Sequence, residues 1–527
     1  MLVVMPREVS IAHVAAALFA IAVASVIVPL VSSIRRKQRI AKLLEPIPGP
    51  KGWFLLGILP ELSRNLHGRL HEFEEGLMLQ YGGRVNQPWN IFSTNSIFLS
   101  DPEDIKHIMS TKFANYIKSD AFLNAFSDLF GKSFFGLNHA GVPDNGAMWR
   151  LQRKVVMRVF TTNNLRTFSE NIFHKYADKM VEIAKAQGGK VNIAELSSQY
   201  ALQSIFDVLC GVPLEEVDAQ LGLSFVDSMS YIANNIFVRM LEKPYFKYLW
   251  WCMPSEYRLQ REARVMYAIA DSVLEKRLNE STEEIDGRPD IMSRFIRKAR
   301  ELRAEGDADA EGVSVLGLDT LRSIFLTFNS AGWDTTSSVI TYTLYTLVLY
   351  PEVKQKLFKE LQTITKADLT FDGIKKLPYL DAVVNETLRL YPTVPLNQRE
   401  AAEDDILPDG TFIPAGTTIF FSSWYMGRHN PVFGENRDKF CPERWLTMEK
   451  RPSAYDFPVF LAGSRICPGM NMGLTETKIF VATIVSQFDF EMQEGEQLLN
   501  RGYLATPNLT MKDGLPLQLT PRKVPAF

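Results

Sequence analysis

The chain has 527 residues, with 58 basic and 60 acidic side chains and a formal charge of −2. Because these charges nearly cancel, nothing in the composition points to nucleic acid as a partner. Apolar residues make up 46% of the sequence, which is enough for a large core. None of the four cysteines stands in a Cys-x-x-Cys pair, so we expect Cys210, Cys252 and Cys441 to be reduced thiols rather than parts of a disulfide framework or zinc site.

The N-terminal segment is apolar over a length that could cross a membrane. Residues 9–34 include no Asp, Glu, Lys or Arg, and a helix of this length would reach about 39 Å, against a hydrocarbon core of about 30 Å. A cleaved signal peptide would carry its bases before the apolar run, whereas here they follow it. By the positive-inside rule we expect residues 1–34 to be a single-pass anchor in the endoplasmic reticulum membrane, with the rest of the chain in the cytosol. The five bases that follow are Arg35, Arg36, Lys37, Arg39 and Lys42.

Residues 35–50 are predicted to be a basic and Pro-rich hinge, because the run Pro-Ile-Pro-Gly-Pro at 46–50 cannot continue a helix. Residues 51–527 would then form one large domain. Within it, 319–350 is apolar-rich and free of proline, which predicts one long helix, and Pro351 is placed to open the next.

Strand-like alternation is confined to short pieces near 85–99, 411–421 and the C-terminus. There the runs 509–512 and 515–519 flank Asp513-Gly514, which predicts a hairpin. The fold class expected is mainly α with small β-sheets, in a single large domain behind the transmembrane helix.

A glycine-containing loop surrounds the fourth cysteine. A thiolate that binds a metal must be kept deprotonated and needs N–H groups that accept its charge. Glycines let the backbone close around the sulfur, and a helix starting just after it adds its positive end. The alternative is a buried structural cysteine. The loop contains Phe460, Gly463, Arg465, Cys467 and Gly469.

Three further motifs share the chain with this loop. Glu386-x-x-Arg389 places an acid and a base one helical turn apart, which alone is more often a solvated face. Asp334-Thr335 lies inside the long helix, where both residues are poor helix formers. Trp149 and Arg153, spaced four apart, share one helical face, as in any amphipathic helix.

Together the loop and the motifs resemble the cytochrome P450 family of haem-thiolate monooxygenases, over nearly all of residues 46–527. The resemblance implies haem b, held non-covalently apart from a bond between the iron and Cys467, and a thiolate ligand favours O–O cleavage. It implies that Arg465, Trp149 and Arg153 contact the haem propionates, and that Arg399 does so as well. Phe460, Gly463 and Gly469 would shape the haem-binding loop.

The same resemblance assigns Asp334 and Thr335 to proton delivery during oxygen activation. It also implies that Glu386, Arg389 and Arg444 form a buried structural ion cluster. The sequence departs from the family pattern at Ser464, often proline, and at Gly473, often alanine. One branch of fatty-acid hydroxylases carries a glutamate bonded to haem at the position of Ala331, so alanine here supports non-covalent haem.

The segments 394–416, 426–445 and 511–515 resemble the long-chain fatty-acid and alkane ω-hydroxylase branch. We therefore expect a monooxygenase that inserts one atom of O2 into an apolar substrate, by ω-hydroxylation of fatty acids or alkanes. The alternatives are another lipophilic substrate (a sterol, terpenoid or xenobiotic), a haem-thiolate isomerase or dehydratase, which Asp334-Thr335 argues against, and a non-catalytic haem protein. Four phenylalanines recur at every fourth position and form either the wall of a substrate channel or the core-facing stripe of a helix: Phe122, Phe126, Phe130 and Phe134.

Electrons are expected to come from a separate protein. Only 60 residues follow Cys467 in the chain of 527, too few for a flavin domain, and no Gly-rich dinucleotide motif stands between a strand and a helix. We expect the partner to be an NADPH-dependent flavoprotein reductase in the same membrane. A basic cluster would be part of its docking face: Arg150, Arg153, Lys154 and Arg158.

Overall fold

The computed structural model describes residues 28, 31–66, 68–89, 95–140, 143–242, 250–306, 316–499, 501–504 and 506–527. Most of the predicted anchor lies outside these residues. Residues 31–43, which include the five bases, are helical. Among the described helices, none combines the length and the apolar character needed to cross a membrane.

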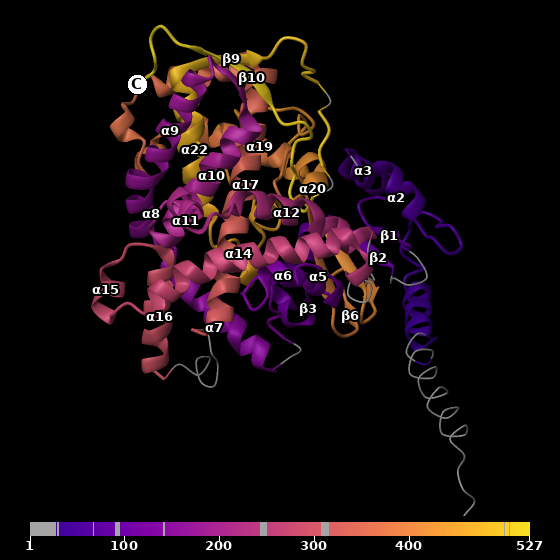
Figure 1. Ribbon diagram of the computed structural model, residues 1–527. Helices are drawn as coiled ribbons and strands as arrows, with labels where there is room; N and C mark the ends of the chain where they lie inside the picture. The colour runs from indigo at the N-terminus through magenta and orange to yellow at the C-terminus, as the bar shows by residue number, and fades with distance from the viewer. Residues whose placement is uncertain are drawn as a thin grey trace, which may run out of the picture.

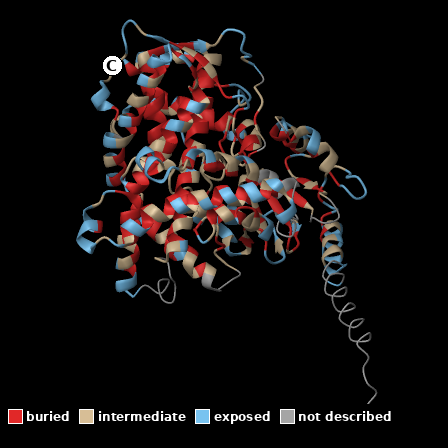
Figure 2. Cartoon of the chain, viewed as in Figure 1, coloured by how far each residue is buried: buried red, intermediate tan, exposed pale blue. Residues whose placement is uncertain are grey.

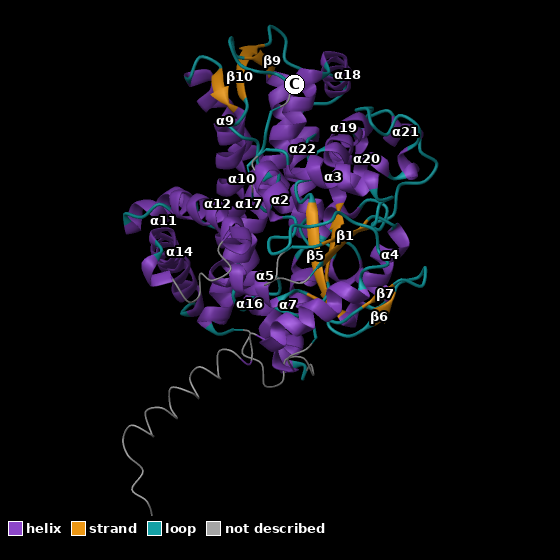
Figure 3. Cartoon of the chain, turned by 90° about the vertical axis from the view of Figure 1, so that its right-hand side faces the viewer, coloured by secondary structure: helices purple, strands orange, loops and turns teal. Residues whose placement is uncertain are grey.

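Helices dominate the described chain, as predicted (Figure 3). They are α2 Leu59–Asn65, α3 Leu70–Gln80, α4 Pro102–Lys106, α5 Asp120–Ala125, α6 Ser127–Phe130, α7 Pro143–Val159, α8 Thr162–Phe168, α9 His174–Ala186, α10 Ile193–Cys210, α11 Leu214–Leu221, α12 Phe225–Glu242, α14 Pro254–Leu278, α15 Thr282–Gly287, α16 Ile291–Ala304, α17 Leu318–Leu349, α18 Pro351–Leu361, α19 Pro378–Leu390, α20 Ser423–His429, α21 Arg444–Thr447 and α22 Met470–Gln487. The strands are β1 Val85–Gln87, β2 Ser96–Leu99, β3 Tyr116–Ile117, β4 Lys190–Asn192, β5 Leu396–Ala401, β6 Asp405–Ile406, β7 Phe412–Ile413, β8 Thr418–Ser422, β9 Phe488–Met492 and β10 Pro516–Pro521.

The long helix α17 runs through the middle of the molecule and packs against α10, α14 and α22 (Figure 1). Its range confirms the prediction over 319–350, and Pro351 opens α18 as expected. Hydroxyl side chains are tolerated in its buried half because they donate hydrogen bonds to carbonyls of their own helix. For example, Thr341 Oγ1 donates to the carbonyl of Ser337 at 2.8 Å.

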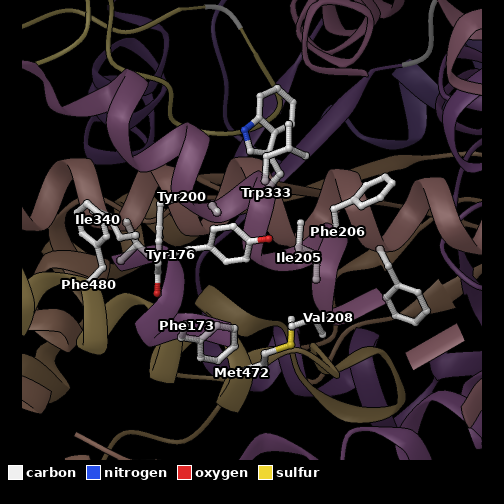
Figure 4. Close-up of a cluster of buried hydrophobic side chains, with 14 of the residues drawn as sticks. Phe173, Tyr176, Tyr200, Ile205, Phe206, Val208, Trp333, Ile340, Met472 and Phe480 are labelled. Carbon is white, nitrogen blue, oxygen red and sulfur yellow. The ribbon is translucent and has the colours of Figure 1, made fainter. Parts of the chain in front are cut away.

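The core lies between α9, α10, α17 and α22, where buried residues concentrate (Figure 2). Figure 4 shows Tyr200, Phe206, Trp333 and Phe480 in this cluster, all of them buried. Each large apolar side chain of this kind contributes roughly 1.5–3 kcal/mol to stability on burial. The indole of Trp333 also donates to Ser198 Oγ at 2.7 Å, so its one polar atom is satisfied. This packing fixes α17 relative to the start of α22.

Two small sheets lie apart from each other, one beside α2 and α3 and one near the C-terminus (Figure 1). The first has the order β1-β2-β8-β5-β3, with β2 and β8 parallel and the other pairs antiparallel. It contains strands in both 85–99 and 411–421, as predicted. The second has the order β4-β10-β9. A separate antiparallel pair joins β6 to β7.

The predicted C-terminal hairpin is wrong, although its turn exists. Asp513 and Gly514 both adopt positive φ, at 59° and 65°, as an Asp-Gly hairpin turn requires. The strand after the turn, β10, pairs with β9 and β4 instead of with 509–512. The segment before the turn bonds elsewhere, since the amide of Leu509 donates to the carbonyl of Thr393 at 2.9 Å. The turn follows from local sequence, whereas its strand partners are distant.

The second half of the predicted hinge packs on the catalytic body. Ile40, Leu44 and Ile47 are buried against residues of the five-stranded sheet. The side chain of Asn86 donates to the carbonyl of Leu44, and its amide donates to the carbonyl of Pro48, both at 2.9 Å. The division at residues 34 and 50 stays a prediction.

Candidate active site

Cys467 lies in the predicted loop, directly before α22. The loop contains two 3-10 turns, Pro458–Phe460 and Gly463–Arg465, and the amide of Cys467 donates to the carbonyl of Phe460 at 2.8 Å. Gly463 has φ 58°, and a Cβ there would collide with the carbonyl oxygen of Met109. Glycine is therefore required at this position by both backbone angle and space.

The start of α22 directs backbone N–H groups at the sulfur. Burial, the largest influence, raises the pKa of the Cys467 thiol. The N–H groups of Gly469 and Met470 and the charge of Arg153 lower it. The helix begins at Met470, within one turn of the cysteine. These donors favour a thiolate, the form that binds a metal ion.

Three arginines surround this loop, of which Arg399 is buried and Arg153 and Arg465 are partly buried. Arg153 donates to the carbonyl of Ile466, next to the cysteine. Arg465 donates to the carbonyls of Phe134 and Leu137 at 3.0 Å each. Arg399, on β5, is 5% exposed and donates to the carbonyl of Gln398 at 2.5 Å. The structure thus brings together the arginines named from sequence.

None of these three arginines forms an ion pair with an acid in the described part of the chain. Burial lowers the pKa of Arg399 to about 10. Burial and the neighbouring charges of Arg399 and Arg153 also lower the pKa of Arg465. Grouped buried cations without a carboxylate are unfavourable, because each loses hydration and repels the others. An anionic ligand would relieve this cost.

Trp149 lies beside Arg465, and its indole N–H is a hydrogen-bond donor without a partner among the described residues. The guanidinium of Arg465 lies over its ring at 4.6 Å from the centroid. The indole Nε1 of Trp149 and the NH2 group of Arg399 are buried, with no hydrogen-bond partner among the described residues. Two propionate carboxylates beside the Cys467 thiol would supply acceptors for these groups. The residues present therefore fit haem.

Sequence reasoning missed Lys118 and His139, which belong to the same cationic group. Burial, and then the charges of Arg465 and Arg399, lower the pKa of Lys118. His139 Nδ1 lies 3.2 Å from a terminal nitrogen of Arg465, and its pKa is lowered to about 4 by burial and by that arginine. A neutral His139 can accept this hydrogen bond. Both residues stand in segments without a motif, so no local signal could have found them.

Asp334 and Thr335 lie on α17, close to the start of α22. Thr335 Oγ1 donates back to the carbonyl of Ala331 at 2.6 Å, and a Cβ placed on Gly473 would be 3.7 Å from Thr336 Oγ1. The acid–threonine pair and the Cys467 loop thus belong to one region. Burial raises the pKa of Asp334, while a hydrogen bond from Asn508 lowers it. Asn508 was not identified from sequence.

The ion cluster forms around Glu386, which is fully buried together with Arg389. Glu386 accepts from Arg389 at 2.7 and 2.8 Å and from Arg444 at 3.0 Å. It also accepts from the indole of Trp445 at 2.8 Å and from the amide of Cys441 at 2.7 Å. Both carboxylate oxygens are therefore occupied by protein donors, which suits a structural role.

The repeat of four phenylalanines is not one helical stripe, because α5 ends at Ala125 and α6 begins at Ser127. Phe122 stacks on Phe126 with ring centroids 4.6 Å apart, and Phe126 stacks on Phe130 at 5.5 Å. Phe134 lies 5.7 Å from Phe328 on α17. Phe122, Phe126 and Phe130 thus form a stacked aromatic wall along α5 and α6, and Phe134 packs separately against α17.

Comparison with known proteins places these features in a family. The family model described as Cytochrome P450 matches residues 47–512. Cytochrome P450 CYP94D108 of Paris polyphylla is 30% identical over 497 residues, covering 89% of this chain and 92% of the relative. Cytochrome P450 94A1 of Vicia sativa is 26% identical over 492 residues, 90% of each. Cytochrome P450 704C1 of Pinus taeda is 29% identical over 486 residues, 86% of this chain and 89% of the relative.

Proposed function

Because the chain belongs to the cytochrome P450 family, whose members are monooxygenases that bind haem iron through a cysteine, we propose that it ω-hydroxylates long-chain fatty acids or alkanes. The observation that carries the proposed site is the group of buried donors around Cys467 that have no anionic partner. The resemblance of the segments 394–416, 426–445 and 511–515 to the ω-hydroxylase branch supports the substrate class.

In the proposed enzyme the group bound is haem b. Cys467 would bind its iron, and Trp149, Arg153, Arg399 and Arg465 would hold its propionates. When bound, haem supplies the activation of O2, which a thiolate ligand promotes. Burial raises the pKa of the Cys467 thiol, and the backbone N–H groups of Gly469 and Met470 and the charge of Arg153 act against it, so these groups would stabilise the thiolate that binds the iron.

Asp334 and Thr335 would supply protons. The overall reaction converts substrate, O2, NADPH and one proton to hydroxylated product, water and NADP+, so each turnover forms one water. Burial raises the pKa of Asp334, which increases the protonated fraction of its carboxyl. The carboxyl would take a proton from solvent, and Thr335 Oγ1 would pass it toward the oxygen.

An aromatic wall favours a long apolar substrate. Phe122, Phe126 and Phe130 offer stacked ring faces beside α17, and Lys118 Nζ lies 5.1 Å from the centroid of the Phe122 ring at one end of this row. A chain of methylene groups gains about 0.8 kcal/mol for each group that it buries. Such a wall would orient an alkyl chain without fixing its polar end.

The proposed location is the endoplasmic reticulum membrane, with the catalytic domain in the cytosol and an NADPH-dependent flavoprotein reductase as electron donor. The uncharged segment 9–34 and the bases after it support this orientation. The loop Trp53–Leu56, just after the Pro-rich segment, adds apolar surface, since Phe54 is 94% exposed. Exposed apolar side chains of this kind suit a lipid surface.

The decisive experiment is a substrate-binding spectral screen with fatty acids, alkanes and sterols, followed by turnover with NADPH and a reductase. We expect fatty acids or alkanes to shift the haem spectrum and to be hydroxylated at the terminal carbon. A spectral shift and product only with sterols would support the alternative of another lipophilic substrate. Binding without NADPH-dependent product would support the isomerase or the non-catalytic alternative.

The proposed relay has its own test in Thr335→Ala. Without this hydroxyl, protons should arrive late and oxygen should leave as peroxide. We expect substrate binding to persist and the peroxide released per NADPH consumed to rise severalfold. Peroxide release equal to wild type would show that Thr335 is outside the relay.

A further inference from the structure

The Asp334 carboxyl has one hydrogen-bond partner among the described residues, and this partner comes from the C-terminal loop. Asn508 Nδ2 donates to Asp334 Oδ2 over 2.6 Å, across 174 residues of sequence. In the described part of the chain no ion pair involves Asp334, and its Oδ1 accepts no hydrogen bond. The acid proposed for proton delivery is thus held at one oxygen only.

The position of Asn508 is fixed by bonds that do not involve Asp334. Thr506 Oγ1 donates to the carbonyl of Asn508 at 2.7 Å. The next residue, Leu509, is held through its amide by Thr393, and its carbonyl accepts from Ser338 Oγ at 2.7 Å. Ser338 lies one helical turn after Asp334, so the loop spans this turn of α17. The amide is therefore placed in advance of any change at the acid.

A neutral amide is a suitable partner for an acid that must cycle. A guanidinium would strongly favour the carboxylate form, whereas an uncharged donor favours it only modestly. Two influences act on the pKa of Asp334: burial raises it and Asn508 lowers it. No charged side chain of the described residues is among them. Both protonation states therefore stay accessible, as proton transfer requires.

We propose that Asn508 is the positioning residue of the proton relay, which holds the Asp334 carboxyl through Oδ2 and leaves Oδ1 to exchange protons. This inference rests on the proposed role of Asp334 as the acid. In each transfer the carboxyl releases its proton toward Thr335 Oγ1 and regains one from solvent. The amide N–H bond to Oδ2 is kept throughout.

The test compares Asn508→Leu, which has a similar size and no donor, with Ser338→Ala, which loosens the same loop without touching the acid. Asp334→Asn identifies the carboxyl. In infrared spectra of the haem protein, the carbonyl band absent from Asp334→Asn should move to higher frequency in Asn508→Leu and persist to higher pH. Ser338→Ala should leave this band unchanged.

Turnover gives a second readout. Asn508→Leu should slow substrate-dependent NADPH consumption about fivefold, as for the loss of one hydrogen bond. The alkaline limb of its pH profile should move to higher pH, because loss of the donor raises the pKa of the acid. Asn508→Asp keeps the size and replaces the amide by a second carboxyl, whose charge also raises the pKa of Asp334, so it should act in the same direction if Asn508→Leu does not fold.

The outcomes separate the two proposals. The role of Asn508 would be overturned if Asn508→Leu and Asn508→Asp had the infrared band and the alkaline limb of wild type. If NADPH consumption were still slowed in Asp334→Asn, the role of the acid would remain. NADPH consumption at the wild-type rate in Asp334→Asn would overturn the relay itself. A band shift in Ser338→Ala as large as that in Asn508→Leu would reduce Asn508 to loop packing.

Discussion

Two groups of buried arginines in this protein differ in how far their charges are satisfied. Arg389 and Arg444 surround Glu386, and every oxygen of that carboxylate accepts from a protein donor. Arg399 and Arg465 lie near Cys467 with no acid paired to them in the described chain, and one nitrogen of Arg399 has no partner there. We call the first the closed cluster and the second the open cluster.

The difference separates structure from ligand binding. In the closed cluster the desolvation of the charges is offset by their mutual attraction and by hydrogen bonds, so the group is complete as folded. The open cluster carries the same desolvation without a counter-charge. The rest of the fold must offset the desolvation cost of such a group. When an anion binds, the new ion pairs and hydrogen bonds contribute to the affinity. Burial alone therefore does not identify a site, whereas burial without partners does.

The largest expected effect tests the centre of the open cluster. Cys467→Ser should abolish the red-shifted Soret band of the reduced, carbon-monoxide-bound protein, because that band requires a thiolate ligand. Cys210→Ser, Cys252→Ser and Cys441→Ser should retain it. Difference spectroscopy of the purified proteins measures both. Retention of the band in Cys467→Ala would refute the assignment of the ligand.

The closed cluster should respond through stability. Glu386→Ala leaves two buried guanidinium groups without their acid, which should cost about 3–5 kcal/mol of unfolding free energy. Denaturant unfolding of the haem protein measures this loss. The matched control is Glu182→Ala, which removes the exposed partner of Lys185 and should cost about 0–1 kcal/mol. Equal costs for the two variants would remove the distinction between closed cluster and surface ion pair.

The open cluster should respond through haem retention instead. Arg399→Leu removes a cation that has no acidic partner among the described residues, so the unfolding free energy should change little while haem transfer to an acceptor apoprotein becomes about tenfold faster. Arg428→Leu is the control, because burial lowers the pKa of Arg428 to about 10 as well, but it packs over Trp424. If haem leaves both variants at the same rate, Arg399 has no specific role.

A feature of the fold or of the site could be predicted from the sequence where its signal lies within one short segment. The range of α17 and the helix after Cys467 follow from residue spacing within short segments. The C-terminal turn was predicted for the same reason, and its strand pairing failed because the partners are distant in sequence.

The residues missed in the site share this cause. Asn508 meets Asp334 across 174 residues, and Lys118 joins the open cluster from a segment that no motif marks. Tertiary packing alone creates these contacts. Family resemblance supplied Arg399 because it names a position, but it says nothing of residues outside its motifs.

The smallest effect concerns the pH dependence of the open cluster. Burial and the charge of Arg465 lower the pKa of His139 from 6.5 to about 4, so the folded protein keeps this residue neutral. Between these values the unfolded chain binds more protons, and stability therefore falls as the pH drops from about 6.5 toward 4. Since His139 is partly exposed, solvent screening reduces its contribution to about 1 kcal/mol. Unfolding free energies at pH 7.5 and 5, compared between wild type and His139→Gln, should show that much additional loss in wild type. Equal losses in both proteins would mean that His139 is not coupled to the cations around Cys467.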